Sequence, residues 1–360
     1  MSQKLVTYKV RVNRPCRLFI DDEEIAILEE LKLTKIELPE GEYLRKVVAI
    51  DNTSICDEAV IVLSGASKLE DIVLDTAGLE EAKRNALPEE KFKVGDWYFE
   101  PTEDRLSVEL SHHINDEYFF ETVNIPEQIV YAGYVYPVTS IGDYDFYECS
   151  TLKSVIIPNS ITSIWDSAFL GCESLTSVVI PNSVMSIGNS AFLGCESLSN
   201  ITIPNSVRHI GAFACQETGF YNDKFNWKEG ALYINNCLIA VNENLSGNYT
   251  IKHGTRLIAS SAFYRCDLLK SVTIPNSIAS IGERVFYGCD SLISITIPTS
   301  VMSVGANAFL DCRELSIINY KGTKEQWNKI ELDDNWNNIC LFKEERYIQI
   351  IRCSDGEIHL

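Results

Sequence analysis

The chain has 360 residues, of which 46% are hydrophobic and 23% are charged, so a large core is available and extensive disorder is not expected. Its formal net charge of −20 repels phosphate backbones and anionic lipid headgroups, which argues against nucleic acid and membrane surfaces as partners. No run of about 18 apolar residues is present, so we expect no transmembrane helix.

The first 80 residues predict a small antiparallel β-sandwich. Alternating or β-branched stretches between turn residues predict strands at 5–12, 17–20, 32–38, 43–50, 60–63 and 72–74. Residues 16–22, followed by 36–43, resemble the PEGA-type surface β-module, in which a strand of the form xVxIDG precedes an LPxGxY turn. Glu23 stands where that pattern has glycine.

A helix and a cap are expected next. Residues 78–87 carry apolar side chains on one side and charges elsewhere, which predicts a helix that Pro88 ends. We therefore assign 1–80 to the β-module and 81–91 to a linker helix. We expect 92–140 to form the N-terminal cap and an atypical first coil of a repeat array, because 123–126 already match a repeat strand.

A 23-residue phrase, I-G-x-x-A-F-x-x-C-x-x-L-x-x-V-x-I-P-N-S-V-x-S, fills the second half of the chain. Its clear copies start at Ile141, Ile164, Ile187, Ile258, Ile281 and Val304, and a degenerate copy starts at Ile210. A short fixed period means one supersecondary unit stacked on copies of itself, which predicts a mostly β solenoid. The repeats occupy 141–318, with an insertion at 212–257, and 319–360 form the C-terminal cap.

The most regular positions of the phrase predict interior columns. One column is leucine (Leu152, Leu175, Leu198, Leu269, Leu292, Leu315) and another is phenylalanine (Phe146, Phe169, Phe192, Phe263, Phe286, Phe309). The ninth position is cysteine in six copies (Cys149, Cys172, Cys195, Cys266, Cys289, Cys312). Stacked side chains point in parallel, which disfavours disulfide geometry, so we expect a ladder of buried thiols.

This phrase resembles the BspA-type leucine-rich repeat, an adhesin-like family of bacterial and protozoan proteins. The resemblance covers residues 92–353, including a C-terminal segment around Trp327 and Trp336 that is similar to the family's capping piece. It implies a right-handed leucine-rich-repeat solenoid of 23-residue coils with caps. It also implies a binding protein, often at the cell surface, that adheres to host or bacterial partners.

The phrase fails after Ile210, and an aromatic-rich excursion follows. Asn235 and Asn236 predict a hairpin turn between strands at 231–234 and 237–241, and the repeat phase resumes at 249–251. Insertions in solenoids map to loops on one face, often the binding face. Two interpretations stay open: the aromatics plug a break in the stack, or they form a protruding platform for a partner. The residues concerned are Phe220, Tyr221, Phe225, Trp227 and Tyr233.

The outward positions of the repeat strands form a second candidate surface. They are small and mostly hydroxylated, so they suit hydrogen bonds to glycans or protein backbone. They lack the aromatic and Arg anchors typical of protein hot spots, and a face without a partner is the alternative. The candidates are Ser177, Val179, Asn200, Thr202, Thr273 and Thr296.

No motif for catalysis, cofactor or metal binding stands out. His112 and His113 are adjacent on a predicted strand and point to opposite faces, which disfavours a shared metal. The acidic run 21–24 is interpreted as an exposed turn, because no alternating oxygen-ligand loop follows it. Phosphate-binding, nucleophile-elbow and zinc-protease motifs are absent from the sequence. We expect no catalytic residue, no cofactor and no metal.

The main functional hypothesis is a monomeric, non-catalytic interaction or adhesion protein that binds a protein or glycan through its repeat surface. The alternative is an intracellular scaffold or regulatory protein of the same architecture, favoured by twelve reduced cysteines and no recognisable export signal at the N-terminus. The family resemblance suggests the cell surface, so the location stays open. A third hypothesis, an enzyme, requires two carboxylates about 5 to 10 Å apart in a crevice at the insertion.

Overall fold

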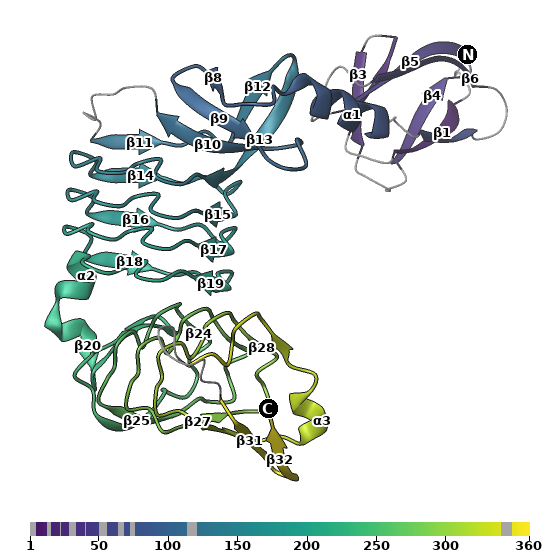
Figure 1. Ribbon diagram of the computed structural model, residues 1–360. Coiled ribbons are helices and arrows are strands. Elements are labelled where there is room, and N and C mark those ends of the chain that lie inside the picture. Colours follow the sequence, from purple (N-terminus) through teal and green to yellow (C-terminus); the bar gives the residue numbers. More distant parts are fainter. Residues whose placement is uncertain are drawn as a thin grey trace. The chain divides into compact units, whose positions relative to one another are not determined.

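The computed structural model describes residues 5–12, 16–21, 23–28, 34–39, 41–49, 56–63, 68–72, 76–113, 121–339 and 348–360 (Figure 1). The chain divides into two compact units. The first comprises Met1–Glu90, Pro101–Val108 and Gln128–Pro137, and the second comprises Lys91–Glu100, Glu109–Glu127 and Val138–Leu360. The expected contribution of Asp22 to an acidic turn lies outside the described residues.

The first unit contains two small sheets. The three-stranded sheet has the order β4 (Thr34–Pro39), β1 (Leu5–Val12), β7 (Lys68–Ile72), and the four-stranded sheet has the order β3 (Glu23–Leu28), β2 (Cys16–Ile20), β5 (Gly41–Ala49), β6 (Cys56–Leu63). The second sheet is antiparallel throughout, as predicted, whereas β1 and β7 are parallel. The PEGA-type resemblance stays a prediction.

Strand β3 was not predicted from the sequence. Its first residues are Glu23 and Glu24, which the sequence suggested as part of an exposed acidic turn. Of the described residues in this run, Asp21 has the turn conformation, with a φ of 47°, and β3 then pairs with β2 through a register shift after Leu18. Both glutamates are exposed, so their charge does not oppose strand formation at a sheet edge.

Helix α1 spans Thr76–Ala86, close to the predicted 78–87, and belongs to the first unit. Its carbonyl groups are used by two residues from later in the chain. The Tyr136 hydroxyl donates to the Lys83 carbonyl at 2.9 Å, and the Arg105 Nε donates to the Arg84 carbonyl at 2.8 Å. The hairpin of β12 (Gln128–Tyr131) and β13 (Tyr134–Ile141) turns at Ala132 and Gly133, both with positive φ.

The second unit begins with short cap strands and continues as a stack of coils. The cap strands are β8 (Phe92–Val94), β9 (Trp97–Pro101), β10 (Val108–His113) and β11 (Thr122–Asn124). One parallel ladder then contains β14 (Ser154–Ile156), β16 (Ser177–Val179) and β18 (Asn200–Thr202), and a second contains β15 (Ser163–Ile164), β17 (Ser186–Ile187) and β19 (His209–Ile210). Each pairing advances by one 23-residue period, which confirms the predicted solenoid.

The predicted columns fill the interior. The rings of Phe146, Phe169 and Phe192 stack with centroids 4.9 and 5.3 Å apart and interplanar angles of 2°. The rings of Phe286 and its neighbours Phe263 and Phe309 stack in the same way after the insertion, at 4.8 and 5.6 Å. All six leucines and all six cysteines of the predicted columns are buried. Equivalent residues repeat the same packing, so the core is one continuous column within each of two stacks. The coils that start at Ile141, Ile164 and Ile187 form the first stack, and those that start at Ile258, Ile281 and Val304 form the second stack.

Along one arc of each coil, the main-chain hydrogen bonds to the next coil all run in one direction. Counting the Ile141-type residue as position 1, the N–H groups at positions 4, 6 and 8 donate to carbonyl groups at positions 3, 5 and 7 of the next coil. For example, Phe169 donates to Ala191 at 2.8 Å, and Gly171 donates to Leu193 at 2.8 Å. Positions 4 and 8 have positive φ in the coils starting at Ile164 and Ile187, with values of 56° and 54° at Ser167 and Ser190. Along this arc each coil therefore donates to the next coil, whereas at positions 2 and 22 the next coil donates back, as from the Gly188 N–H to the Ile164 carbonyl at 2.8 Å.

The insertion consists of one long coil and one short coil. Leu238 pairs with Ile258 and thereby takes position 1, so the coil from Ile210 to Cys237 has 28 residues and the coil from Leu238 to Leu257 has 20. The long coil contains α2 (Gly219–Asn222), the 3₁₀ turn η1 (Lys224–Asn226), β20 (Trp227–Lys228) and β21 (Ala231–Ile234). Strand β21 forms the predicted hairpin with β22 (Cys237–Val241).

The second stack follows in phase. Its ladders are β23 (Gly247–Thr250), β25 (Leu269–Thr273), β27 (Ser294–Ile297), β29 (Ile317–Tyr320), β31 (Ile350–Cys353) and β32 (Gly356–His359), and β26 (Ser280–Ile281), β28 (Ser303–Val304) and β30 (Glu331–Leu332). Strand β24 (Leu257–Ile258) pairs with β22. Helix α3 (Lys324–Trp327) has a capping box between Thr323 and Gln326. Buried Trp336 closes the phenylalanine column against Phe309 at 6.5 Å.

Candidate functional site

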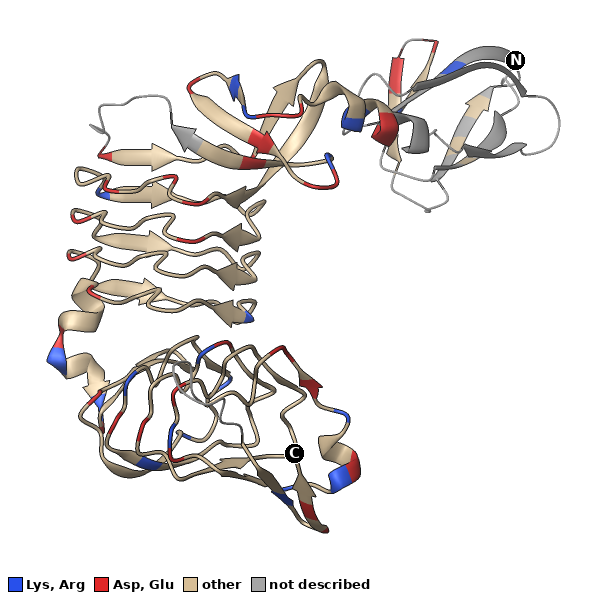
Figure 2. Cartoon of the chain, viewed as in Figure 1, with Lys and Arg blue, Asp and Glu red and all other residues tan. Residues whose placement is uncertain are grey.

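The strand ladder of the first stack has an uncharged outer face. In β14, β16 and β18 the middle residue is buried and the two outer residues face outward, as the alternation of a strand requires. Ser177, Val179, Asn200 and Thr202 are all exposed there. Figure 2 shows these three strands without acidic or basic residues, although the chain as a whole is strongly acidic. We call these outward positions the strand face.

Two aliphatic side chains lie side by side on the strand face. The register between β14 and β16 places Ile156 beside Val179, and Val179 pairs in turn with Thr202. Val179 is 75% exposed and Ile156 is 54% exposed. In the second stack the equivalent threonines, Thr273 and Thr296, pair with each other and are half-buried. At these outward strand positions the exposed aliphatic side chains therefore occur in the first stack, where the second stack has threonine.

The aromatic residues of the insertion occupy three different environments. Tyr233 packs against the core of the second stack, and its hydroxyl accepts the Lys252 N–H at 3.3 Å. Tyr221 and Trp227 lie edge to face with ring centroids 5.2 Å apart, and the Trp227 indole donates to the Tyr221 carbonyl at 2.7 Å. Phe225 is 84% exposed, and Phe220 is half-buried. The same segment therefore contains aromatic side chains that pack inside the break in the repeat and one, Phe225, that is exposed to solvent.

Local capping residues fix this segment. The Thr218 hydroxyl donates to the Cys215 carbonyl at 2.8 Å and accepts the Tyr221 N–H at 3.1 Å, which starts α2. The Asp223 carboxylate accepts the Phe225 N–H at 2.9 Å, which starts η1. Thr218 stands at position 9 of its coil, where other copies have cysteine. At this position the Thr218 hydroxyl caps the short helix with which the chain leaves the repeat.

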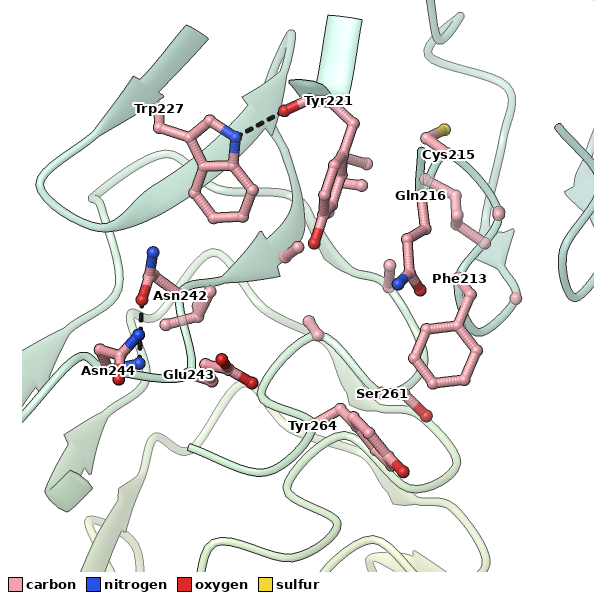
Figure 3. A pocket seen from close by; sticks show the side chains of 18 residues that line it. Phe213, Cys215, Gln216, Tyr221, Trp227, Asn242, Glu243, Asn244, Ser261 and Tyr264 are labelled. Atoms are coloured by element: carbon pink, nitrogen blue, oxygen red, sulfur yellow. Dashed lines mark hydrogen bonds between the residues drawn. The ribbon is translucent and has the colours of Figure 1, made fainter. Parts of the chain in front are cut away.

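A cavity of about 500 Å³ lies between the long coil and the first coil of the second stack (Figure 3). Its lining includes Phe213, Cys215, Gln216, Tyr221, Trp227, Asn242, Glu243, Asn244, Ser261 and Tyr264. Phe213 and Tyr264 meet edge to face at 5.2 Å and join its two sides. Burial, followed by the nearby negative charges of Glu217 and Glu243, raises the pKa of the Tyr221 hydroxyl. We call this space the break pocket.

Comparison with models of protein families shows to which family this chain belongs. The model of the BspA type Leucine rich repeat region (6 copies) matches residues 112–246 and 234–333, more than half of the chain. The chain belongs to this leucine-rich repeat family. Comparison with curated proteins finds no match.

Solved structures of bacterial leucine-rich repeat proteins are similar to this family member. A leucine rich cell surface protein from Faecalibacterium prausnitzii is 23% identical over 69% of this chain and 98% of its own, with a TM-score of 0.31. The leucine-rich repeat protein of T. pallidum is 24% identical over 63% and 91%, with a TM-score of 0.34. One from Bacteroides ovatus is 23% identical over 67% of both chains, with a TM-score of 0.37.

The cysteine ladder of this leucine-rich repeat protein is a packing feature. Nine cysteines, those whose side chains the structure describes, are free and buried. The Cys172 and Cys195 thiols donate to the carbonyl groups of Phe146 and Phe169, one coil earlier, at 3.0 and 3.1 Å. Burial raises the pKa of the Cys215 thiol to about 12. Nucleophilic thiolates are therefore disfavoured, and the predicted ladder of buried thiols is confirmed.

Groups able to perform chemistry are sparse in the described residues. No cluster of three or more His, Cys, Asp or Glu side chains that could hold a metal occurs among them. His112 and His113 lie in β10, and their side chains are outside the described part. Glu243 is the single carboxylate among the residues that line the break pocket, so the lining does not supply the pair that a glycosidase requires. Nor does any helix within the described ranges have the length and hydrophobicity to cross a bilayer.

The sequence predicted two of the residues that line the break pocket as candidates and did not indicate the others. Tyr221 and Trp227 were among the candidates, whereas Gln216, Glu243 and Tyr264 were not. The distance of 48 residues between Ile210 and Ile258 signalled an irregularity but gave no division into coils. The pairing of Leu238 with Ile258 supplies that division and shows which polar residues face the gap.

Proposed function

We propose that this protein is a non-catalytic interaction protein that binds a protein or glycan partner on the strand face. The observation that carries the proposal is the exposed pair Ile156 and Val179 within rows of hydroxyl and amide side chains. Exposed aliphatic side chains rimmed by polar ones are typical of interaction sites. The polar rows supply hydrogen bonds that a glycan or an extended peptide can use.

The charge distribution supports the same face. A net charge of −20 repels acidic partners from most of the surface, whereas β14, β16 and β18 contribute no charge. Desolvating an uncharged face costs less than desolvating ion pairs, so binding there retains more of its favourable contact energy. The phenylalanine and leucine columns hold the strands rigid behind the face, which limits the entropy lost on binding.

An adhesion role is the finer part of the proposal. It is supported by the family and by the similarity to the leucine rich cell surface protein from Faecalibacterium prausnitzii. The buried thiols no longer favour a reducing compartment, because thiols sealed inside the stack and held protonated are protected from oxidants in either location. Their number therefore does not support the scaffold alternative.

The strand face is tested with a charged substitution and a matched control. The purified chain is screened on a glycan array and against a peptide display library, and the best ligand is titrated by biolayer interferometry. Val179→Glu is expected to weaken that ligand at least about ten-fold, which corresponds to about 1.4 kcal/mol. Met302→Glu, at a side chain that is 66% exposed and away from the strand face, is expected to bind normally. Equal affinity of both variants would remove the strand face as the binding surface.

A further inference from the structure

The long coil leaves a row of backbone donors without acceptors. In the preceding coil, the N–H groups of Ser190, Phe192 and Gly194 donate to the carbonyl groups of Ala212, Ala214 and Gln216 at 2.8, 2.8 and 3.1 Å. The corresponding N–H groups of the long coil belong to Phe213, Cys215 and Glu217. They find no acceptor within the part of the chain that the structure describes.

Two residues of this donor row lie in the wall of the break pocket. Donors at these positions point toward the following coil in the coils that start at Ile141, Ile164 and Ile187, and here the following coil is three residues short of a full period. The short coil reaches the second stack through Val241, whose N–H donates to the Ala262 carbonyl at 2.8 Å. Phe213 and Cys215 line the pocket, so their main chain borders an open space. Cys215 is buried, whereas Phe213 and Glu217 are exposed. A buried donor without a partner is costly, so the Cys215 N–H favours an acceptor atom in the pocket.

The other walls define which acceptors fit. Glu243 presents a carboxylate, and Gln216 and Tyr221 present an amide and a hydroxyl around the same space (Figure 3). The lining contains no Lys, Arg or His to balance a second negative charge. A phosphate or carboxylate would accept from the donor row, but it would be repelled by Glu243. A neutral ligand with hydroxyl groups accepts from the N–H groups and donates to the carboxylate.

The aromatic side chains and the volume of the break pocket further restrict the class of ligand that fits. Tyr221 and Trp227 on one side, and Phe213 and Tyr264 on the other, offer apolar surface for the C–H groups of a pyranose. A volume of about 500 Å³ lies in the range of small-molecule sites. Phe213 and Glu217 have positive φ values of 59° and 58°, so the donor row follows a curved main chain that a straight peptide strand does not match.

We infer that the break pocket binds the neutral terminal sugar of a glycan, one or two pyranose units long. The donor row donates hydrogen bonds to hydroxyl oxygens of the sugar, the Glu243 carboxylate accepts a hydrogen bond from a sugar hydroxyl, and the aromatic residues pack against the ring. This site is separate from the strand face, and it stands whether or not the strand face binds a partner.

The test uses the full chain labelled with ¹⁵N and a panel of free sugars. Glucose, galactose, mannose, N-acetylglucosamine and their disaccharides are titrated beside sialic acid, a peptide of four residues and inorganic phosphate. A neutral sugar is expected to shift the amide resonances of Phe213, Cys215 and Glu217 in a saturable manner. Glu243→Gln is expected to weaken that sugar at least ten-fold, and Tyr221→Phe at least three-fold.

Two controls separate the pocket from its surroundings. Glu229→Gln removes an exposed carboxylate of the same insertion that does not line the pocket, and it is expected to leave the affinity unchanged. Val179→Glu is expected to bind the sugar normally even if it abolishes binding at the strand face. The inference is overturned if no neutral sugar shifts the three amides, if Glu229→Gln weakens binding as much as Glu243→Gln, or if the peptide or an anion binds there more tightly.

Discussion

The guanidinium group of Arg256 donates to the carbonyl oxygen of Val207 at 2.6 Å, across the whole of the long coil. It also donates to the Pro204 carbonyl at 2.8 Å, and the Asn235 side chain accepts the Ile203 N–H at 3.1 Å. In a regular array these main-chain groups lie against the next turn of the repeat. At the insertion the side chains of Arg256 and Asn235 form hydrogen bonds with these main-chain groups instead, and they hold the two stacks together.

Replacing Arg256 by Met is therefore expected to uncouple the stacks. Loss of two charged hydrogen bonds removes the Arg256 donors from both carbonyl groups, of which, among the described residues, only that of Pro204 keeps another partner, the Val207 N–H at 3.2 Å. The substitution is expected to lower the free energy of unfolding by about 2 to 4 kcal/mol. Because each coil contacts mainly its neighbours, unfolding in urea is expected to split into two transitions by circular dichroism. Arg208→Met removes an exposed arginine nearby and is expected to cost under about 0.5 kcal/mol. A single transition at the control's midpoint would contradict this role of Arg256.

Two glycines one coil apart are expected to differ in their tolerance of alanine. Gly194 has a φ of 73°, and a Cβ there would lie 3.6 Å or more from its neighbours, so Gly194→Ala carries only the backbone cost of about 1 to 2 kcal/mol. A Cβ on Gly211 would lie 2.3 Å from the Asn189 nitrogen, so Gly211→Ala must displace main chain and is expected to cost more than about 3 kcal/mol. Urea midpoints measure both, and equal losses would contradict the crowding at Gly211.

Alkaline pH is expected to destabilise the fold through the buried thiols. The pKa of Cys215 is about 12 in the folded chain, whereas an unfolded thiol ionises near pH 8.5. Below about pH 8.5 both states are protonated, and the contribution to stability is fully present. As pH rises toward 12 only the unfolded state loses the proton, so the unfolding free energy falls by about 1.4 kcal/mol per pH unit for this thiol.

Urea midpoints between pH 8 and pH 11 check this slope. Cys215→Ala is expected to fall less steeply than the unsubstituted chain, by about the amount given for one thiol. Ellman's reagent provides a second measurement, since the buried cysteines are expected to react only on unfolding. Rapid reaction of the folded chain with more than three equivalents, the number of cysteines outside the nine described as buried, would contradict their burial.

Two serines at equivalent places in the Pro-x-Ser turns are expected to respond to alanine with opposite signs. The Ser183 hydroxyl is buried without a hydrogen-bond partner among the described residues, whereas the Ser300 hydroxyl donates to the Ile278 carbonyl at 2.6 Å. Ser183→Ala removes an unsatisfied group and is expected to stabilise by about 1 kcal/mol, and Ser300→Ala is expected to destabilise by about the same amount. Thermal unfolding of the pair measures the difference, and a loss in both variants would show that Ser183 is hydrogen-bonded.

The regular part of the fold was predictable because each position of the phrase has one physical task. Leu198 and Phe192 recur at a fixed spacing, so their burial follows from the period alone. The paired asparagines at 235 and 236 predicted the hairpin because few other residues adopt the backbone conformation of a two-residue hairpin turn. Strand β3 was missed because its acidic first residues suggest a turn, and sheet pairing with β2 overrode that local preference.

The break pocket was not predictable in the same way. Its donor row consists of main-chain groups, which carry no signal in the side-chain sequence. Arg256 is one of many charged residues in the sequence, and nothing in the residues around it indicates that it links the two stacks. Glu243 lies in a turn where an acidic residue is ordinary. These roles follow from the shortening of one coil by three residues, and only the strand pairing reveals that change.

The repeated pattern of hydrogen bonds between coils has a consequence for how this gene can change in length. Like coils carry the same donors and acceptors at the same positions, so gain or loss of the 23 residues from Ile164 to Ser186 creates no mismatched junction. The long and short coils do not share this freedom, because each alone would meet a neighbour of the wrong length. They must be inherited as a pair, which makes the segment from Ile210 to Leu257 the fixed landmark around which copies of the repeat can multiply.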